Sequence, residues 1–94
     1  MRAIDVSCER SGSGWECHVA VHDDGETRHR VHVSRLDLER LAPGATDPEE
    51  LVRASFDFLL QRESKESILR VFDLTVIGRY FPEYEREIGR RLTR

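Results

Sequence analysis

The stretch SILRVFDLTVIGRYFPEY, residues 67–84, is the densest apolar segment in this otherwise hydrophilic chain. Nine of the fourteen residues from Ile68 to Phe81 are apolar or aromatic, whereas the whole chain is 38% hydrophobic and 35% charged. Each large apolar side chain contributes roughly 1.5–3 kcal/mol when it is buried, so something must cover this segment. The cover is the protein's own sheet, a second copy of the chain, or a different partner.

The residues before this segment predict a three-stranded antiparallel β-meander over residues 1–34. Apolar and polar side chains alternate along three stretches, which is the period of half-buried strands. SGSG at residues 11–14 and DDG at residues 23–25 separate the stretches as turns. The inward sets are expected to be Ile4, Val6 and Cys8, then Trp15, Cys17, Val19 and Val21, then Thr27, His29, Val31 and Val33.

The second turn fixes the register of the last two strands. A three-residue loop at 23–25, with Gly25 in the left-handed conformation, places Val21 opposite Thr27 and aligns the apolar faces of both strands. A two-residue loop would mismatch these faces. The three-residue loop is therefore predicted.

The first turn leaves two registers open, and the two cysteines depend on the choice. A four-residue loop at 11–14 places Cys8 opposite Cys17, whereas a two-residue loop at 11–12 places Cys8 opposite Trp15. Both thiols face inward, where cysteine behaves as a small hydrophobe. In a cytosol they are expected to be reduced, and a cross-strand disulfide is geometrically allowed only under the first register.

The second half, residues 35–94, is predicted to be helical, which gives a single α+β domain over residues 1–94. Ser34 is typical of an N-cap, and Pro43 and Gly44 end the short helix that follows it. A longer helix is predicted within residues 46–63. Its expected cap is Asp47, with Pro48 at the first helical position.

The longer helix is expected to lie at the centre of the domain. Only a narrow stripe of its surface is polar, and this stripe consists of Arg53, Asp57 and Gln61. Apolar side chains cover most of the remaining circumference, so one face of a three-stranded sheet cannot bury them all.

Residues 65–92 form what we call the arm. Its apolar residues do not fit one stripe of a straight helix, so two short helices at about 65–72 and 74–80 are predicted, with Asp73 as the second N-cap. A third helix begins near Pro82. The arm is expected to pack on the central helix and on a sister chain, in a homodimer whose interface contains Ile68, Phe72, Leu74, Ile77, Tyr80, Phe81 and Tyr84.

The sequence PEELVRASFDFLLQRESKESILRVFDLTVIGRYFPEYEREI resembles a family of small uncharacterised bacterial proteins with an ESIL and YFPEY pattern in the C-terminal half. In that family an extended N-terminal half precedes this pattern. The resemblance covers about residues 15–88 and implies no activity.

The meander followed by T-x-x-E-L is also similar to HicB-like antitoxin domains, and RVHVS followed by two helices is similar to ribbon-helix-helix repressors. These likenesses imply toxin inhibition or operator binding. The chain departs from the repressor pattern because two strands precede the ribbon strand. In addition, Asp47, Glu49 and Glu50 stand where basic residues are usual.

The net charge of −3 disfavours a protein that binds by neutralising many phosphates. A candidate nucleic-acid face nevertheless exists on the outer side of the sheet, where Arg28, Arg30, His32 and His18 gather. The predicted cross-strand neighbours of these residues include Glu16 and Glu26, so a solvated sheet face is the preferred interpretation.

No motif in the sequence predicts a reaction or a bound cofactor. There is no nucleophile elbow, no phosphate-binding loop and no Cys-x-x-Cys motif. The surface histidines are expected to pair with Glu16 and Glu26 rather than to bind a metal. His29 faces inward, and it is expected to be neutral and hydrogen-bonded to the backbone or to a hydroxyl such as that of Thr27.

These observations favour a non-enzymatic interaction protein that associates with itself or with a protein partner through the apolar arm. The alternative is an antitoxin-like or regulatory nucleic-acid-binding protein that uses the outer sheet face. No apolar run has the length of a membrane span, so a cytoplasmic location without membrane contact is expected.

Overall fold

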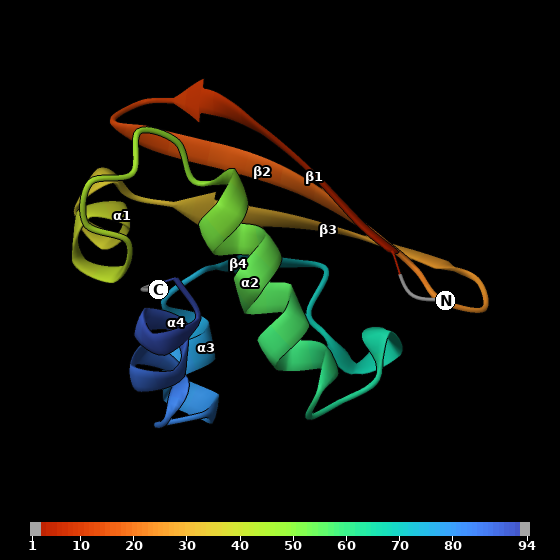
Figure 1. Ribbon diagram of the computed structural model, residues 1–94. Helices are drawn as coiled ribbons and strands as arrows, with labels where there is room; N and C mark the ends of the chain where they lie inside the picture. The colour runs from red at the N-terminus through yellow and green to blue at the C-terminus, as the bar shows by residue number, and fades with distance from the viewer. Residues whose placement is uncertain (1–2, 93–94) are drawn as a thin grey trace.

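The computed structural model describes residues 3–92, so residues 1–2 and 93–94 of the predicted domain lie outside the described range. The fold is α+β, as predicted. The antiparallel meander is extended by a fourth strand, and within residues 3–92 all the helices follow the meander in the chain (Figure 1). In chain order the elements are β1 (Ala3–Ser11), β2 (Gly14–His22), β3 (Glu26–Val33), α1 (Arg35–Leu41), α2 (Glu49–Leu60), the 3₁₀ turn η1 (Lys65–Ser67), β4 (Val71–Asp73), α3 (Val76–Tyr80) and α4 (Tyr84–Leu92).

The predicted register of β2 and β3 is confirmed. Val21 lies opposite Thr27, and the inward faces of the two strands coincide. Gly25 has a φ of 109°, a conformation that residues with a side chain rarely adopt, as the three-residue loop requires. The inward-facing side chains of all three strands of the meander therefore lie on the same face of the sheet.

The structure selects the register that places Cys8 opposite Cys17, and a disulfide joins the two residues. Their Cα atoms are 4.0 Å apart, even closer than the roughly 4.5 Å of a narrow, non-hydrogen-bonded pair in an antiparallel sheet. The expectation that both thiols are reduced is therefore wrong. This narrow pair brings the two side chains close enough for a bond.

The prediction of a helix at 65–72 is wrong, because only η1 is helical and β4 follows it. β4 runs parallel to β3 at the edge of the sheet, giving the order β1-β2-β3-β4. The backbone N–H of Arg30 donates to the carbonyl of Arg70 over 2.7 Å, and that of Leu74 donates to the carbonyl of His32 over 2.9 Å. Hydrogen bonds to the free edge of β3 thus replace those of a helix.

The helices near the middle of the chain begin close to their predicted caps. The Ser34 hydroxyl accepts a hydrogen bond from the backbone N–H of Asp37 over 3.0 Å, as an N-cap does. α2 begins one residue later than predicted, with Pro48 at the cap position. The Asp47 carboxylate still accepts from the backbone N–H of Glu49 over 3.0 Å.

α2 is central, as its wide apolar surface predicted, and it crosses the inner face of the sheet (Figure 1). Phe56 faces the sheet, because its ring centroid lies 5.2 Å from that of His29 and 6.1 Å from that of Phe72. Phe58 faces the opposite way and contacts Phe81 and Tyr84. The sheet and the C-terminal helices therefore bury opposite sides of α2.

α4 docks on α2 through the side predicted from its four-residue spacing. Tyr84 and Ile88 are buried and Leu92 is half-buried. The Tyr84 hydroxyl lies 2.7 Å from the Ser55 hydroxyl, which in turn donates to the carbonyl of Leu51. Within residues 3–92 no helix combines the length and apolarity that crossing a membrane requires.

Candidate functional site: an apolar cavity at the end of α2

A cavity of about 270 Å³ lies where the C-terminal end of α2 meets the segment 67–72 and α3. In Figure 1 η1 and α3 lie on opposite sides of the lower end of α2. Four buried side chains form the base of the cavity, namely Leu59, Ile68, Phe72 and Ile77. Leu69 and Tyr80 stand at its mouth, where they are 49% and 69% exposed.

Three local structures hold the cavity open. After α2 ends, the backbone N–H groups of Arg62 and Glu63 both donate to the carbonyl of Leu59. The 3₁₀ turn η1 then reverses the chain, and the pairing of β4 with β3 fixes the segment that follows. α3 finally returns to the cavity, where residues four apart on the helix, such as Val76 and Tyr80, share a side.

Glu63 is the only ionisable side chain of the lining apart from Tyr80, and burial raises the pKa of its carboxyl group. The nearest cations in the sequence are already occupied. Arg62 lies over the Phe58 ring and pairs with Glu83, while Lys65 pairs with Glu66. Among residues 3–92, Glu63 has no ion pair and no side-chain hydrogen bond. The cavity therefore presents an unneutralised carboxyl group beside apolar walls.

The structure places the seven predicted interface residues in two groups. Five are buried within their own chain: Ile68, Phe72, Leu74, Ile77 and Tyr84. The other two, Tyr80 and Phe81, line the cavity, with Tyr80 exposed and Phe81 half-buried. Much of the cover that the arm needs is thus supplied by the sheet and by α2. Among the apolar residues of the arm, Leu69 and Tyr80 at the cavity and Val71 on β4 stay exposed to a partner.

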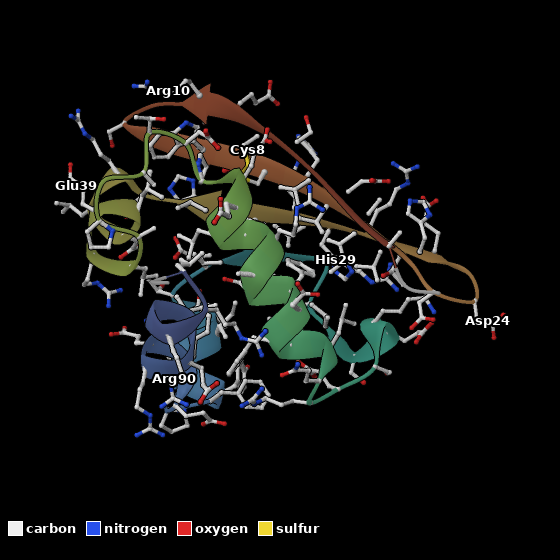
Figure 2. All side chains as sticks on the ribbon, viewed as in Figure 1. Cys8, Arg10, Asp24, His29, Glu39 and Arg90 are labelled. Atoms are coloured by element: carbon white, nitrogen blue, oxygen red, sulfur yellow. A yellow bond between two sulfur atoms is a disulfide. The ribbon has the colours of Figure 1, made fainter. Side chains whose placement is uncertain are left out.

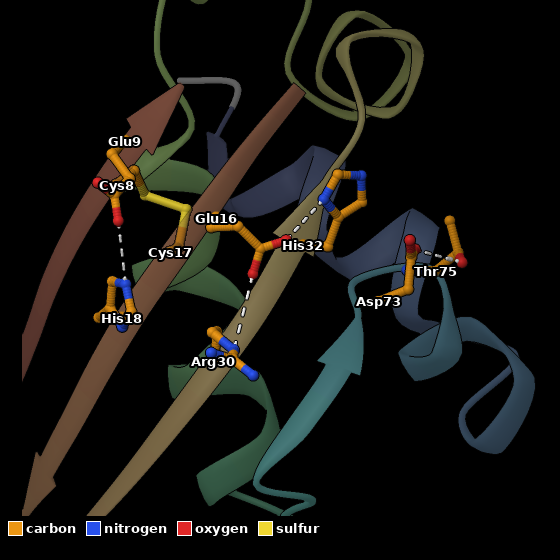
Figure 3. Close-up of polar contacts among 9 residues, drawn as sticks. All are labelled: Cys8, Glu9, Glu16, Cys17, His18, Arg30, His32, Asp73 and Thr75. Atoms are coloured by element: carbon orange, nitrogen blue, oxygen red, sulfur yellow. Dashed lines mark hydrogen bonds and ion pairs between the residues drawn. A yellow bond between two sulfur atoms is a disulfide. The ribbon is translucent and has the colours of Figure 1, made fainter. Parts of the chain in front are cut away.

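The candidate nucleic-acid residues do share the outer face of the sheet, and Figure 3 shows three of them, His18, Arg30 and His32, with acidic neighbours. Glu16 lies 3.0 Å from His32 and 3.8 Å from Arg30, measured between side-chain oxygen and nitrogen atoms. His18 lies 3.3 Å from the carboxylate of Glu9. The predicted pairing of Glu16 with His32 is confirmed.

The rest of this face follows the same pattern. Glu26 pairs with Arg28 and with His22, and the contact with His22 is the one that the register predicted. The other ring nitrogen of His22 lies 3.0 Å from the carboxylate of Asp5. Each cation on this face thus has a carboxylate beside it, which leaves little unopposed positive charge to neutralise phosphates. The nucleic-acid alternative stays a prediction.

His29 is buried between the sheet and α2 (Figure 2). Its Nε2 atom lies 2.9 Å from the Thr27 hydroxyl, and its Nδ1 atom lies 2.8 Å from the carbonyl oxygen of Leu69. Burial lowers the pKa of the imidazole, and the nearby charge of Arg70 adds to this effect, while the hydrogen bond to Leu69 opposes it. The predicted bond to Thr27 is confirmed, and the bond to Leu69 ties β3 to the wall of the cavity.

The buried imidazole gives a testable pH dependence of stability. The unfolded chain takes up a proton near pH 6.5, whereas folded His29 resists protonation, so the unfolded state binds more protons below that pH. Lowering the pH below 6.5 is therefore expected to reduce the free energy of unfolding, by at most about 1.4 kcal/mol per pH unit from this residue. Urea titrations at several pH values measure this. The variant His29→Gln should lose this component, and an unchanged pH profile in that variant would contradict the assignment.

No group of three or more His, Cys, Asp or Glu side chains within residues 3–92 is placed to hold a metal ion. The lining of the cavity contributes one carboxyl group, from Glu63, and two hydroxyl groups, from Ser67 and Tyr80. Its chemistry is that of apolar contact with a single charged position.

Sequence reasoning missed Glu63, Leu69 and Val76 as residues of one site. They come together only because β4 turns the chain back toward α2, and that strand was not predicted. A signal for it was present. Val71 and Phe72 are a β-branched and an aromatic residue side by side, and such residues favour strands over helices.

Comparison with known proteins adds no relative to this geometry: no family model, no curated protein and no solved structure matches the chain.

Proposed function

We propose that this protein is a non-enzymatic interaction protein, and that it binds an apolar side chain of another protein chain in the cavity at the end of α2. The observation that carries the proposal is the open apolar cavity with exposed Leu69 and Tyr80 at its mouth. Exposed aromatic residues beside a pocket are typical of the central anchors of protein interfaces.

The size of the cavity favours a side chain over a cofactor. Its volume of about 270 Å³ lies below the roughly 300–1,000 Å³ that small-molecule and cofactor sites usually have. The lining also offers few polar groups to orient a substrate. A single large side chain, delivered by a protein surface, matches both the volume and the lining.

The cellular location of this association is part of the proposal. The absence of a long apolar run motivates the cytoplasmic assignment, whereas the Cys8–Cys17 disulfide is of a kind that persists mainly in oxidising compartments. A cytoplasmic location therefore requires that the Cys8–Cys17 disulfide is protected from cellular reductants.

A neutral apolar fluorophore tests whether the cavity accepts apolar groups. Dilute protein titrated with N-phenyl-1-naphthylamine is expected to give a saturable rise in fluorescence. Leu69→Asp places a charge at the mouth of the cavity and should weaken this binding by at least about tenfold. Leu36→Asp makes the same change at an exposed site on α1 and should leave it unaltered. The absence of saturable binding, or an equal loss in both variants, would contradict the proposal.

A further inference from the structure

Opposite charges near the cavity lack partners within the part of the chain that the structure describes, and Arg70, beside Leu69, is a further cation there without an ion pair. Glu63 lines the cavity, and Arg79 is the exposed residue that directly precedes Tyr80 on α3. Neither side chain forms an ion pair or a hydrogen bond with any residue from 3 to 92. Most other charged groups of the arm are paired, as Glu83 is with Arg62 and Lys65 with Glu66.

The unpaired charges accompany an apolar cavity and an exposed aromatic side chain. Tyr80 is 69% exposed, although it lines an apolar cavity whose base consists of four buried side chains. The same small surface therefore carries an apolar receptor, an aromatic side chain that can fill such a receptor, a cation and an anion. A surface with both halves of each contact is self-complementary.

We infer that the occupant of the cavity is a second copy of this chain, docked by reciprocal exchange of Tyr80. In this homodimer each Tyr80 enters the partner's cavity, and each Arg79 pairs with Glu63 of the other copy. A two-fold axis beside the mouth of the cavity generates both contacts twice, as an isologous interface requires. This inference rests on the proposed function, because it names the protein chain that the cavity binds.

The chemistry of the contact accounts for the unusual features of the surface. The phenol ring of Tyr80 supplies apolar area to Leu69, Phe72 and Val76, while its hydroxyl group can stay near the polar lining residue Ser67. Pairing with Arg79 gives the half-buried Glu63 carboxylate the counter-charge that it lacks in a single chain. Dimer formation is thereby coupled to the ionised form of Glu63.

Charge exchange provides the test. Light scattering over a concentration series is expected to give the wild-type protein a mass approaching twice 10.9 kDa. Glu63→Arg and Arg79→Glu each replace two attractions per dimer with two repulsions, so each should raise the dissociation constant by at least about tenfold. An equimolar mixture of the two variants restores both opposite-charge pairs, and it should recover a mass that stops at two chains.

Two further variants separate this contact from general effects of charge and packing. Arg86→Glu makes the same charge change on the exposed side of α4 and should leave the dissociation constant unaltered. Tyr80→Ala should raise it by at least about thirtyfold, the loss typical of a central aromatic anchor. Circular dichroism and urea unfolding of every variant verify that the chain is folded.

Several outcomes would overturn the inference. A wild-type mass of one chain at all concentrations would exclude a second copy as the occupant. A mixture that stays monomeric, or whose mass grows beyond two chains, would exclude reciprocal exchange. Fluorophore binding tests the proposed function separately. If the protein is monomeric and still binds the probe, the cavity accepts apolar groups, and only the second copy as its occupant is excluded.

Discussion

Phe58→Ala is expected to lower the free energy of unfolding by about 3–5 kcal/mol, which is the range for removing a buried phenylalanine ring. Phe58 is completely buried and lies on the side of α2 that faces away from the sheet. Its ring makes edge-to-face contacts with Phe81 and Tyr84, at centroid distances of 5.8 and 5.3 Å. The Arg62 guanidinium lies 3.7 Å from the ring centroid on the solvent side. Truncation removes all of these contacts together.

Urea denaturation followed by circular dichroism measures this loss against a matched control. Leu36→Ala also truncates a large apolar side chain on a helix, but Leu36 is 77% exposed, and the expected change is within about 0.5 kcal/mol. The total stability of a small domain is about 5–15 kcal/mol, so the Phe58 variant should be marginally folded. A loss below about 1 kcal/mol would show that the C-terminal helices do not cover α2 as described.

Loss of the Cys8–Cys17 disulfide is expected to lower the free energy of unfolding by about 2–3 kcal/mol. The bond closes a short loop with a sequence separation of nine residues, and the restriction that it places on the unfolded chain grows with loop length. The bond also links β1 to β2, with three residues of each strand between it and the turn at 12–13. Denaturation with and without dithiothreitol measures its contribution directly.

A double variant, Cys8→Ala with Cys17→Ala, provides the internal control. Its stability should match that of the reduced wild-type chain to within about 1 kcal/mol, and dithiothreitol should not change it further. Mass spectrometry of the alkylated protein reports the oxidation state independently. Equal stability of the oxidised and reduced wild-type protein would contradict the expected contribution.

The meander was predictable from the sequence because its strands and turns are specified by residues that are close together along the chain. Alternation with a period of two identifies which side chains face inward, and a register error of one residue would turn a whole strand inside out. Gly25 then restricts the second loop to one length, because only that length aligns Val21 with Thr27. The first loop lacks such a constraint, since both of its registers keep the inward faces aligned. The pairing of Cys8 with Cys17 therefore stayed open until the structure was known.

β4 was not predictable in the same way, because its partner lies about forty residues away in the sequence. A short apolar run is compatible with either a strand or a buried helix, and here the free edge of β3 decided the outcome. The consequence reached the site itself. Once Phe72 and Leu74 are placed inside the chain, the arm no longer needs a sister chain along its whole length. The exposed apolar residues of the arm that stay accessible are Leu69 and Tyr80 at the cavity and Val71 on β4.

The cover of α2 by the C-terminal helices has a consequence for how the protein is made. The hairpins of the meander join neighbouring residues and can form as soon as they leave the ribosome. The outer side of α2, by contrast, has no cover until residues beyond 80 have been synthesised, because Phe81 and Tyr84 provide it. A nascent chain that stalls after α2 therefore displays Phe58 to the solvent, as a chaperone substrate would. Translation of the last few turns of helix is the step that converts this exposed intermediate into a closed domain.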